Sequence, residues 1–271
     1  MSRRHLAARL FMRVMFGRVQ GHAQPLPAGA RAFQVQPADG SRLEGLLLPS
    51  HVRPPRGVVL LCHPFLKDGM HYFLHHQLPL ALQQQGYDVA LFNFKGFGRS
   101  TLGGPSFADD ILAVARQLAA ESPGLPLHLL GCSFGGYHLA HALGRGEHGF
   151  TSVALDSVPL SVRDFFRRGP LRPVMGWLSR SRWADATGSA PIGEALAQAG
   201  DLPLAYLYGE SDPYIAAANV QRLLRRCPGL RLYPFAECRH LDGHRRQRQR
   251  YIDTLLDFFA RAEHRARALH G

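Results

Sequence analysis

A serine between glycines is the residue of this chain whose surroundings most clearly predict chemistry. Ser133 lies in a G-x-S-x-G pattern, Gly131-Cys132-Ser133-Phe134-Gly135. Such a serine can attack a carbonyl carbon when it sits at a sharp turn between a strand and a helix, where flanking glycines avoid collisions with the backbone. The apolar residues 127–130 predict the strand before the turn, and residues 134–142 predict the helix after it. The motif in this context predicts a nucleophilic serine.

The rest of the chain alternates between short apolar strands and helical segments, which together must hold this turn in place. Strands are predicted over residues 31–36, 42–48, 57–62, 87–92, 127–130, 151–155, 204–208 and 230–235. Helical periodicity is found at about 72–85, 106–121, 134–144, 215–226 and 246–265. This order predicts an α/β fold with a mostly parallel, eight-stranded sheet and helices on both faces.

The chain is expected to form one domain over residues 25–271, because α/β folds of this length are commonly single domains. The interval 158–201 has no clear strand and is predicted to form a small helical cap over the carboxyl edge of the sheet. Residues 1–24 are predicted to form a basic amphipathic segment. Arg13 interrupts the apolar part of that segment, which disfavours a signal peptide.

The serine motif and the order of the elements resemble the α/β-hydrolase fold family over about residues 30–265, most closely its serine aminopeptidase-like and monoacylglycerol-lipase-like branch. The resemblance implies an acid after the next-to-last strand and a histidine after the last strand. Asp212 follows the strand 204–208, and Glu210 in the same turn is the alternative acid. His240 follows the last predicted strand, with His244 as the alternative.

The resemblance also implies how these residues would act. His240 would remove the proton from Ser133 as the serine attacks a carbonyl carbon and would then donate that proton to the leaving group. Asp212 would orient the imidazole ring and stabilise its charged form. An acyl-serine intermediate would follow, resolved by water or another acceptor.

Backbone N–H groups must stabilise the oxyanion of such a reaction, and here the chain departs from the family. Phe134, directly after the nucleophile, is expected to supply one donor. Where the family usually has His-Gly after the third strand, this chain has His63-Pro64. Because proline has no N–H, Pro64 cannot donate. The resemblance implies Phe65 as the second donor, since in the family the residue beyond the His-Gly pair typically contributes. A second departure lies at residues 93–100, where changed charges are expected to alter packing near the site more than chemistry.

Arginine supplies nearly all of the net charge of +12, since the only lysines are Lys67 and Lys95. The chain has no nucleic-acid motif and no aromatic residues interleaved with its basic runs, so a solvated basic face is favoured and no nucleic-acid partner is expected. No apolar run reaches the roughly 18 residues of a membrane span. The basic segment 1–24 is predicted to be able to lie on a membrane surface.

No metal and no cofactor are expected. His240 and His244 have a spacing that two metal ligands can use, but the adjacent glutamate of zinc proteases is absent. Three further histidines are interpreted as surface or pocket-lining residues: His71, His75 and His76. The four cysteines have no metal-binding spacing and predict free thiols in a reducing, cytoplasmic setting, namely Cys62, Cys132, Cys227 and Cys238.

Hydrolysis of a small-molecule acyl ester is the function that these residues favour, since esters are the easiest substrates for such a site. An acyltransferase or thioesterase acting on an anionic acyl donor is the alternative, prompted by basic residues in the predicted cap, Arg163, Arg167, Arg168 and Arg172. A non-catalytic binding protein that kept the fold is the third hypothesis, which the presence of Ser133, Asp212 and His240 disfavours.

Overall fold

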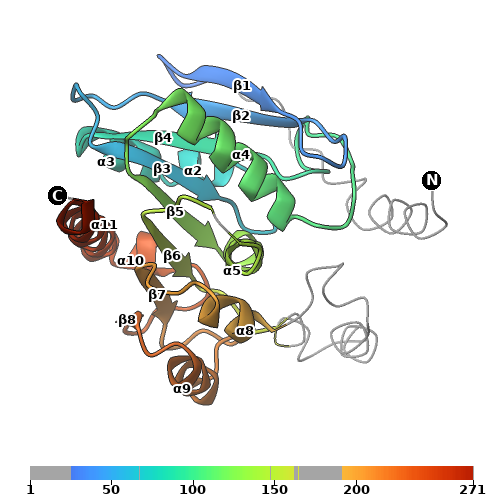
Figure 1. Cartoon of the computed structure of the whole chain (residues 1–271). Coiled ribbons are helices and arrows are strands. Elements are labelled where there is room, and N and C mark those ends of the chain that lie inside the picture. Colours follow the sequence, from blue (N-terminus) through green and yellow to red (C-terminus); the bar gives the residue numbers. More distant parts are fainter. Residues whose placement is uncertain (1–25, 67, 147, 162–163, 165–190, 271) are drawn as a thin grey trace.

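A computed structural model of the chain describes residues 26–66, 68–146, 148–161, 164 and 191–270 (Figure 1). The predicted N-terminal segment 1–24 lies outside these described residues. So do most of the predicted cap, 158–201, and the four arginines that prompted the anionic-donor hypothesis. None of the described helices combines the length and the apolar character needed to cross a membrane.

Eight strands form a single sheet in the order β1-β2-β4-β3-β5-β6-β7-β8. Their bounds are β1 Arg31–Val35, β2 Leu43–Leu48, β3 Gly57–Cys62, β4 Tyr87–Phe92, β5 Leu127–Cys132, β6 Ser152–Asp156, β7 Leu204–Gly209 and β8 Leu230–Phe235. β2 pairs antiparallel with β1 and β4, and all other neighbours are parallel. The predicted mostly parallel, eight-stranded sheet is confirmed.

Helices cover both faces of this sheet (Figure 1). The described helices are α2 His71–His75, α3 Leu78–Gln84, α4 Ala108–Glu121, α5 Phe134–Leu143, α8 Ile192–Ala197, α9 Ala217–Arg226, α10 Gly243–Arg246 and α11 Arg248–His270. Apolar side chains of α4, α5, α8 and α9 pack in one core, and those of α2, α3 and α11 pack in a second. Along β3, Leu60 faces the first core and Leu61 the second, because successive strand residues point to opposite faces. Strands buried on both faces explain the continuous apolar runs.

The helical periodicity over 72–85 corresponds to two short helices, α2 and α3, rather than one. The chain breaks at Gln77, whose φ is 53°. Pro79 explains the break, because in a continuous helix its ring would clash with the carbonyl of His75 and it could not donate a hydrogen bond. Pro79 is accommodated in the first turn of α3 instead.

The predicted site residues lie at one edge of the sheet, because each follows the end of a parallel strand. β3 ends just before His63, and β5 just before Ser133. β7 ends three residues before Asp212, and β8 five residues before His240. Since parallel strands share the edge at which they end, four loops far apart in the sequence meet at this carboxyl edge, where α/β folds bind their ligands.

Candidate active site

Ser133 occupies the turn between β5 and α5 in a strained conformation. Its φ and ψ are 49° and −109°, a region that L-residues rarely adopt and that costs about 1–3 kcal/mol. The turn is held by the Ser133 N–H, which donates to the carbonyl oxygen of Asp156 in β6 at 2.8 Å. Ser133 is 3% exposed. The side chain is therefore presented at one fixed place on the edge of the sheet.

Glycines allow the backbone to pack closely around this turn. A Cβ atom on Gly135 would lie 2.5 Å from the carbonyl carbon of Cys62 and 2.7 Å from the carbonyl oxygen of His63, closer than real Cβ contacts. A Cβ atom on Gly131 would lie 2.7 Å from the backbone nitrogen of Gly136. The first turn of α5 is thus pressed against the end of β3, the strand that leads to Pro64 and Phe65.

His240 lies between Ser133 and Asp212. Its Nε2 is 2.9 Å from Ser133 Oγ, and its Nδ1 is 2.7 Å from Asp212 Oδ2. Because a carboxylate can only accept, Nδ1 carries the proton and Nε2 offers its lone pair to the serine hydroxyl. The His240 side chain is 18% exposed, whereas that of Asp212 is fully buried. The structure therefore brings the three predicted residues into one hydrogen-bonded chain.

The turn after β7 holds the Asp212 carboxylate. Its second oxygen, Oδ1, accepts the backbone N–H of Tyr214 at 2.8 Å. The Tyr214 ring also packs edge-on against the imidazole of His240, with 4.9 Å between the ring centroids. Both carboxylate oxygens are engaged, so the direction in which Asp212 faces His240 is set by the backbone of its own turn.

The two alternatives that the sequence left open lie elsewhere. Glu210 is exposed at the surface. His244 is buried against Tyr72, whose hydroxyl is 3.3 Å from His244 Nε2, and packs edge-on against His76. Burial and nearby positive charges lower the pKa of His244 to about 3, which keeps its ring neutral. Neither residue is hydrogen-bonded to Ser133 or His240 among the described contacts.

The segment after β3 lies beside the start of α5. His63 is fully buried, and its Nε2 accepts the N–H of Phe94 at 3.2 Å, so Nδ1 donates to the carbonyl oxygen of Pro64 at 2.8 Å. Burial lowers the pKa of His63 to about 4 and keeps it neutral. The rings of Phe65 and Phe134 pack edge-on, 5.4 Å apart. The two residues expected to supply oxyanion donors are therefore neighbours.

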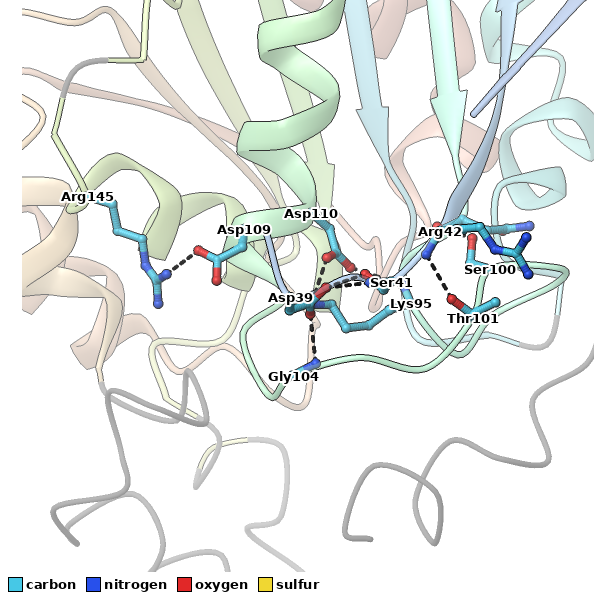
Figure 2. Close-up of polar contacts among 11 residues, drawn as sticks. Asp39, Ser41, Arg42, Lys95, Ser100, Thr101, Gly104, Asp109, Asp110 and Arg145 are labelled. Carbon is cyan, nitrogen blue, oxygen red and sulfur yellow. Dashed lines mark hydrogen bonds and ion pairs between the residues drawn. The ribbon is translucent and has the colours of Figure 1, made fainter. Parts of the chain in front are cut away.

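A buried lysine supports the loop that flanks this segment (Figure 2). The ammonium of Lys95 contacts Asp39 and lies 2.9 Å from Asp110 Oδ1. Burial raises the pKa of Asp39, but hydrogen bonds from Lys95 and Ser41 outweigh it and bring the value to about 2. For Asp110, burial dominates the opposing effect of Lys95 and raises the pKa to about 7. Lys95 thus ties the loop after β4 to the β1–β2 turn and to α4.

This lysine cluster was not predicted from the sequence. The loop that it anchors carries Phe94 and Phe97, which pack edge-on against His63 at 4.9 and 4.8 Å between centroids. The available signal was the rarity of lysine, since Lys67 and Lys95 are the only two in a chain whose other basic residues are arginine and histidine. As for metals, the described part of the chain holds no group of three or more histidine, cysteine or acidic residues that could ligate an ion.

Comparisons with known proteins agree with this architecture. Residues 53–187 match the family model described as serine aminopeptidase, S33. YfhR of Escherichia coli strain K12, an uncharacterized protein, is 27% identical over 249 residues, which cover 88% of this chain and 83% of YfhR.

Solved structures share the fold at low sequence identity. The esterase Pf2001 of Pyrococcus furiosus superposes with a TM-score of 0.70 at 16% identity, covering 89% of this chain and 95% of the esterase. A thermostable carboxyl esterase of Bacillus coagulans gives 0.69 at 14% identity, covering 88% of this chain and 100% of that one. The chain is therefore an enzyme of the α/β-hydrolase fold family, and residues 53–187 match the serine aminopeptidase S33 branch of that family.

Proposed function

We propose that this enzyme hydrolyses a carboxylic ester of a small molecule through an acyl-serine intermediate. The observation that supports this reaction is the hydrogen-bonded chain from Ser133 Oγ through His240 to Asp212. A serine hydroxyl is a weak nucleophile until a base takes its proton, and a base needs a third group to fix its tautomer. This chain of contacts supplies both.

In the proposed reaction, His240 Nε2 accepts the Ser133 proton as Oγ bonds to the ester carbonyl carbon. The imidazolium then gives this proton to the alkoxide oxygen as the carbon–oxygen bond breaks and the alcohol leaves. Water attacks the acyl-serine in a second step, again with His240 as the base, and releases the acid. Asp212 keeps its negative charge throughout and stabilises the imidazolium.

The oxyanion of each tetrahedral intermediate is proposed to bind the backbone N–H groups of Phe134 and Phe65. Phe134 begins α5, so the positive end of that helix dipole faces the developing charge. Close packing of Gly135 on Cys62 and His63 keeps the two backbone segments together. Each such donor contributes about 2.7–4 kcal/mol in other serine hydrolases.

The apolar residues near Ser133 favour a substrate with an apolar acyl group. Phe65 is 44% and Leu66 is 42% exposed, unusually open for large apolar side chains, and the Phe65 ring packs on Phe134 beside the nucleophile. Apolar surface next to polar catalytic groups is the usual composition of a small-molecule site. Two of the solved structures with this fold are esterases by name, which agrees with the proposal.

Turnover of p-nitrophenyl esters of graded acyl length tests the proposal. Ser133→Ala, His240→Gln and Asp212→Asn should each lower kcat by about 10³–10⁴-fold or more, as in other triads. Glu210→Gln and Ser211→Ala, in the same turn as Asp212, are the matched controls and should leave kcat within about twofold. Consumption of acyl-CoA with no turnover of any ester would refute ester hydrolysis and favour the hypothesis of a thioesterase or acyltransferase.

We also propose that the enzyme works in a reducing compartment, since all four cysteines are buried free thiols. The basic residues of segment 1–24 support a peripheral contact with anionic lipid. Co-sedimentation of the full chain with vesicles tests the second point. Binding should occur to anionic and not to neutral vesicles and should fall when the five arginines of residues 1–18 are changed to glutamine; equal binding to both vesicle types would contradict it.

A further inference from the structure

A buried carboxylate that the proposed reaction does not use lies beside the site. Asp156 ends β6, directly opposite Cys132 in the register of β5, and is 2% exposed. Its Oδ1 accepts the Ser157 hydroxyl at 2.9 Å, and its Oδ2 accepts the Tyr251 hydroxyl at 2.8 Å. Burying a carboxylate is costly, so its presence here requires a reason.

Asp156 and Ser157 connect two strained loops of the site. The backbone oxygen of Asp156 accepts the N–H of Ser133 at 2.8 Å. The hydroxyl oxygen of Ser157 accepts the N–H of Leu241, the residue after His240, at 3.1 Å. Ser133, Ser157 and Leu241 have positive φ values of 49°, 54° and 58°. Such backbones persist only where surrounding contacts hold them, and these hydrogen bonds are such contacts.

The chemistry of a carboxylate explains why an acid stands at this position. A carboxylate only accepts hydrogen bonds, so both hydroxyls beside it must donate to it. Once the Ser157 proton points at Asp156, the lone pairs of Ser157 Oγ remain for the Leu241 N–H. Burial raises the pKa of Asp156 to about 6, so the acceptor-only form prevails above neutral pH.

We propose that Asp156 is a positioning residue: by fixing the Ser157 hydroxyl, it holds the Leu241 peptide and thereby keeps the His240 ring within proton-transfer distance of Ser133. The inference rests on the proposed function of the site. Asp156 itself touches neither substrate nor the reacting atoms. A displacement of the base by about 1 Å costs on the order of 100-fold in rate, so loss of this contact should appear in kcat.

Steady-state kinetics test the inference. They are measured at pH 8 and at a temperature below the melting temperature of each variant. Ser157→Ala removes the acceptor of the Leu241 N–H, and Asp156→Asn places an amide donor beside the two hydroxyls. Each should lower kcat about tenfold or more with KM within twofold. Tyr251→Phe is the matched control, because it removes the other hydroxyl donor to Asp156 but keeps the ring that packs against His244, and it should change kcat less than threefold.

An NMR measurement separates this inference from the proposed function. The Nδ1 proton of His240, bonded to Asp212, should exchange with solvent faster in Ser157→Ala than in wild type, whether or not esters are turned over. If kcat and this exchange rate are unchanged in Ser157→Ala while wild type hydrolyses esters, the positioning role is overturned and the function stands. If wild type turns over no ester, the proposed function fails, and the exchange rate still decides the positioning role.

Discussion

Gly135→Ala is the substitution whose effect follows most directly from the geometry of the site. The added methyl would lie 2.5 Å from the carbonyl carbon of Cys62 and 2.7 Å from the carbonyl oxygen of His63. Both are backbone atoms at the end of β3, so no side chain can rotate away to make room. Either the start of α5 or the end of β3 has to move.

The size of this movement sets the expected loss. Carbon atoms pack at about 3.5–4.0 Å, so the two backbone segments must separate by about 1 Å. Because α5 carries the Phe134 donor and β3 leads to the Phe65 donor, the separation widens the proposed oxyanion site by about the same amount. A misplacement of 1 Å costs on the order of 100-fold in rate. Overpacking costs about 1–3 kcal/mol of stability, of which alanine in a helix recovers up to about 1 kcal/mol.

The assay compares kcat for a p-nitrophenyl ester with unfolding in urea. Gly229→Ala is the matched control, because a Cβ atom there meets nothing within 4 Å. It should leave both kcat and stability near wild type. Gly135→Ala should lose about 100-fold in kcat while keeping most of its stability. Wild-type kcat in Gly135→Ala would refute the argument that close approach of β3 and α5 shapes the oxyanion site.

Two further predictions concern buried charges. Burial raises the pKa of Asp156 from 3.8 to about 6, so the folded state binds this proton more tightly than the unfolded state does. This tighter proton binding adds roughly 3 kcal/mol to the free energy of unfolding. The contribution is complete below about pH 4 and is lost as the pH rises through 6. Other buried acids, such as Asp110, lose stability over the same range in both proteins, so the test is the difference between them. Urea unfolding at pH 4 and pH 8 should show about 3 kcal/mol more loss in wild type than in Asp156→Asn; parallel pH curves would contradict it. Lys95→Met leaves Asp39 and Asp110 without their cation and should cost about 3–5 kcal/mol at pH 8. Arg99→Met, on the exposed part of the same loop, should cost less than 1 kcal/mol, and an equal loss in both variants would contradict a special role for Lys95.

The sheet could be predicted from the sequence because its central strands, such as β3, β4, β5 and β6, are buried on both faces. A run such as Gly57–Cys62 has no polar residue to place at a surface, and such runs mark the strands to within one or two residues of the structure. The division of the helical segment 72–85 into α2 and α3 was missed, although Pro79 was visible. Periodicity reports which side chains are buried and not where the backbone breaks.

The order of residues along the chain was enough to predict which side chains meet at the site, but not how they contact one another. Ser133, Asp212 and His240 each follow a strand, so their arrival at one edge of the sheet follows from topology. Whether His240 or His244 faces the serine depends on how the loop after β8 folds back, which local sequence does not encode. Lys95 contacts Asp39, 56 residues away in the sequence, and Asp156 contacts Tyr251, 95 residues away. Their partners are set by strand register and packing, which become known only in three dimensions.

Labelling with a fluorophosphonate probe, followed by peptide mass spectrometry, tests the central claim most directly. A fluorophosphonate reacts preferentially with a serine whose proton a neighbouring base can take. The full chain should carry one adduct per molecule, on the peptide that contains Ser133, and His240→Gln should slow labelling by about 10³-fold or more. No adduct on wild type, an adduct on another residue, or undiminished labelling of Ser133→Ala would contradict the assignment of Ser133 as the nucleophile.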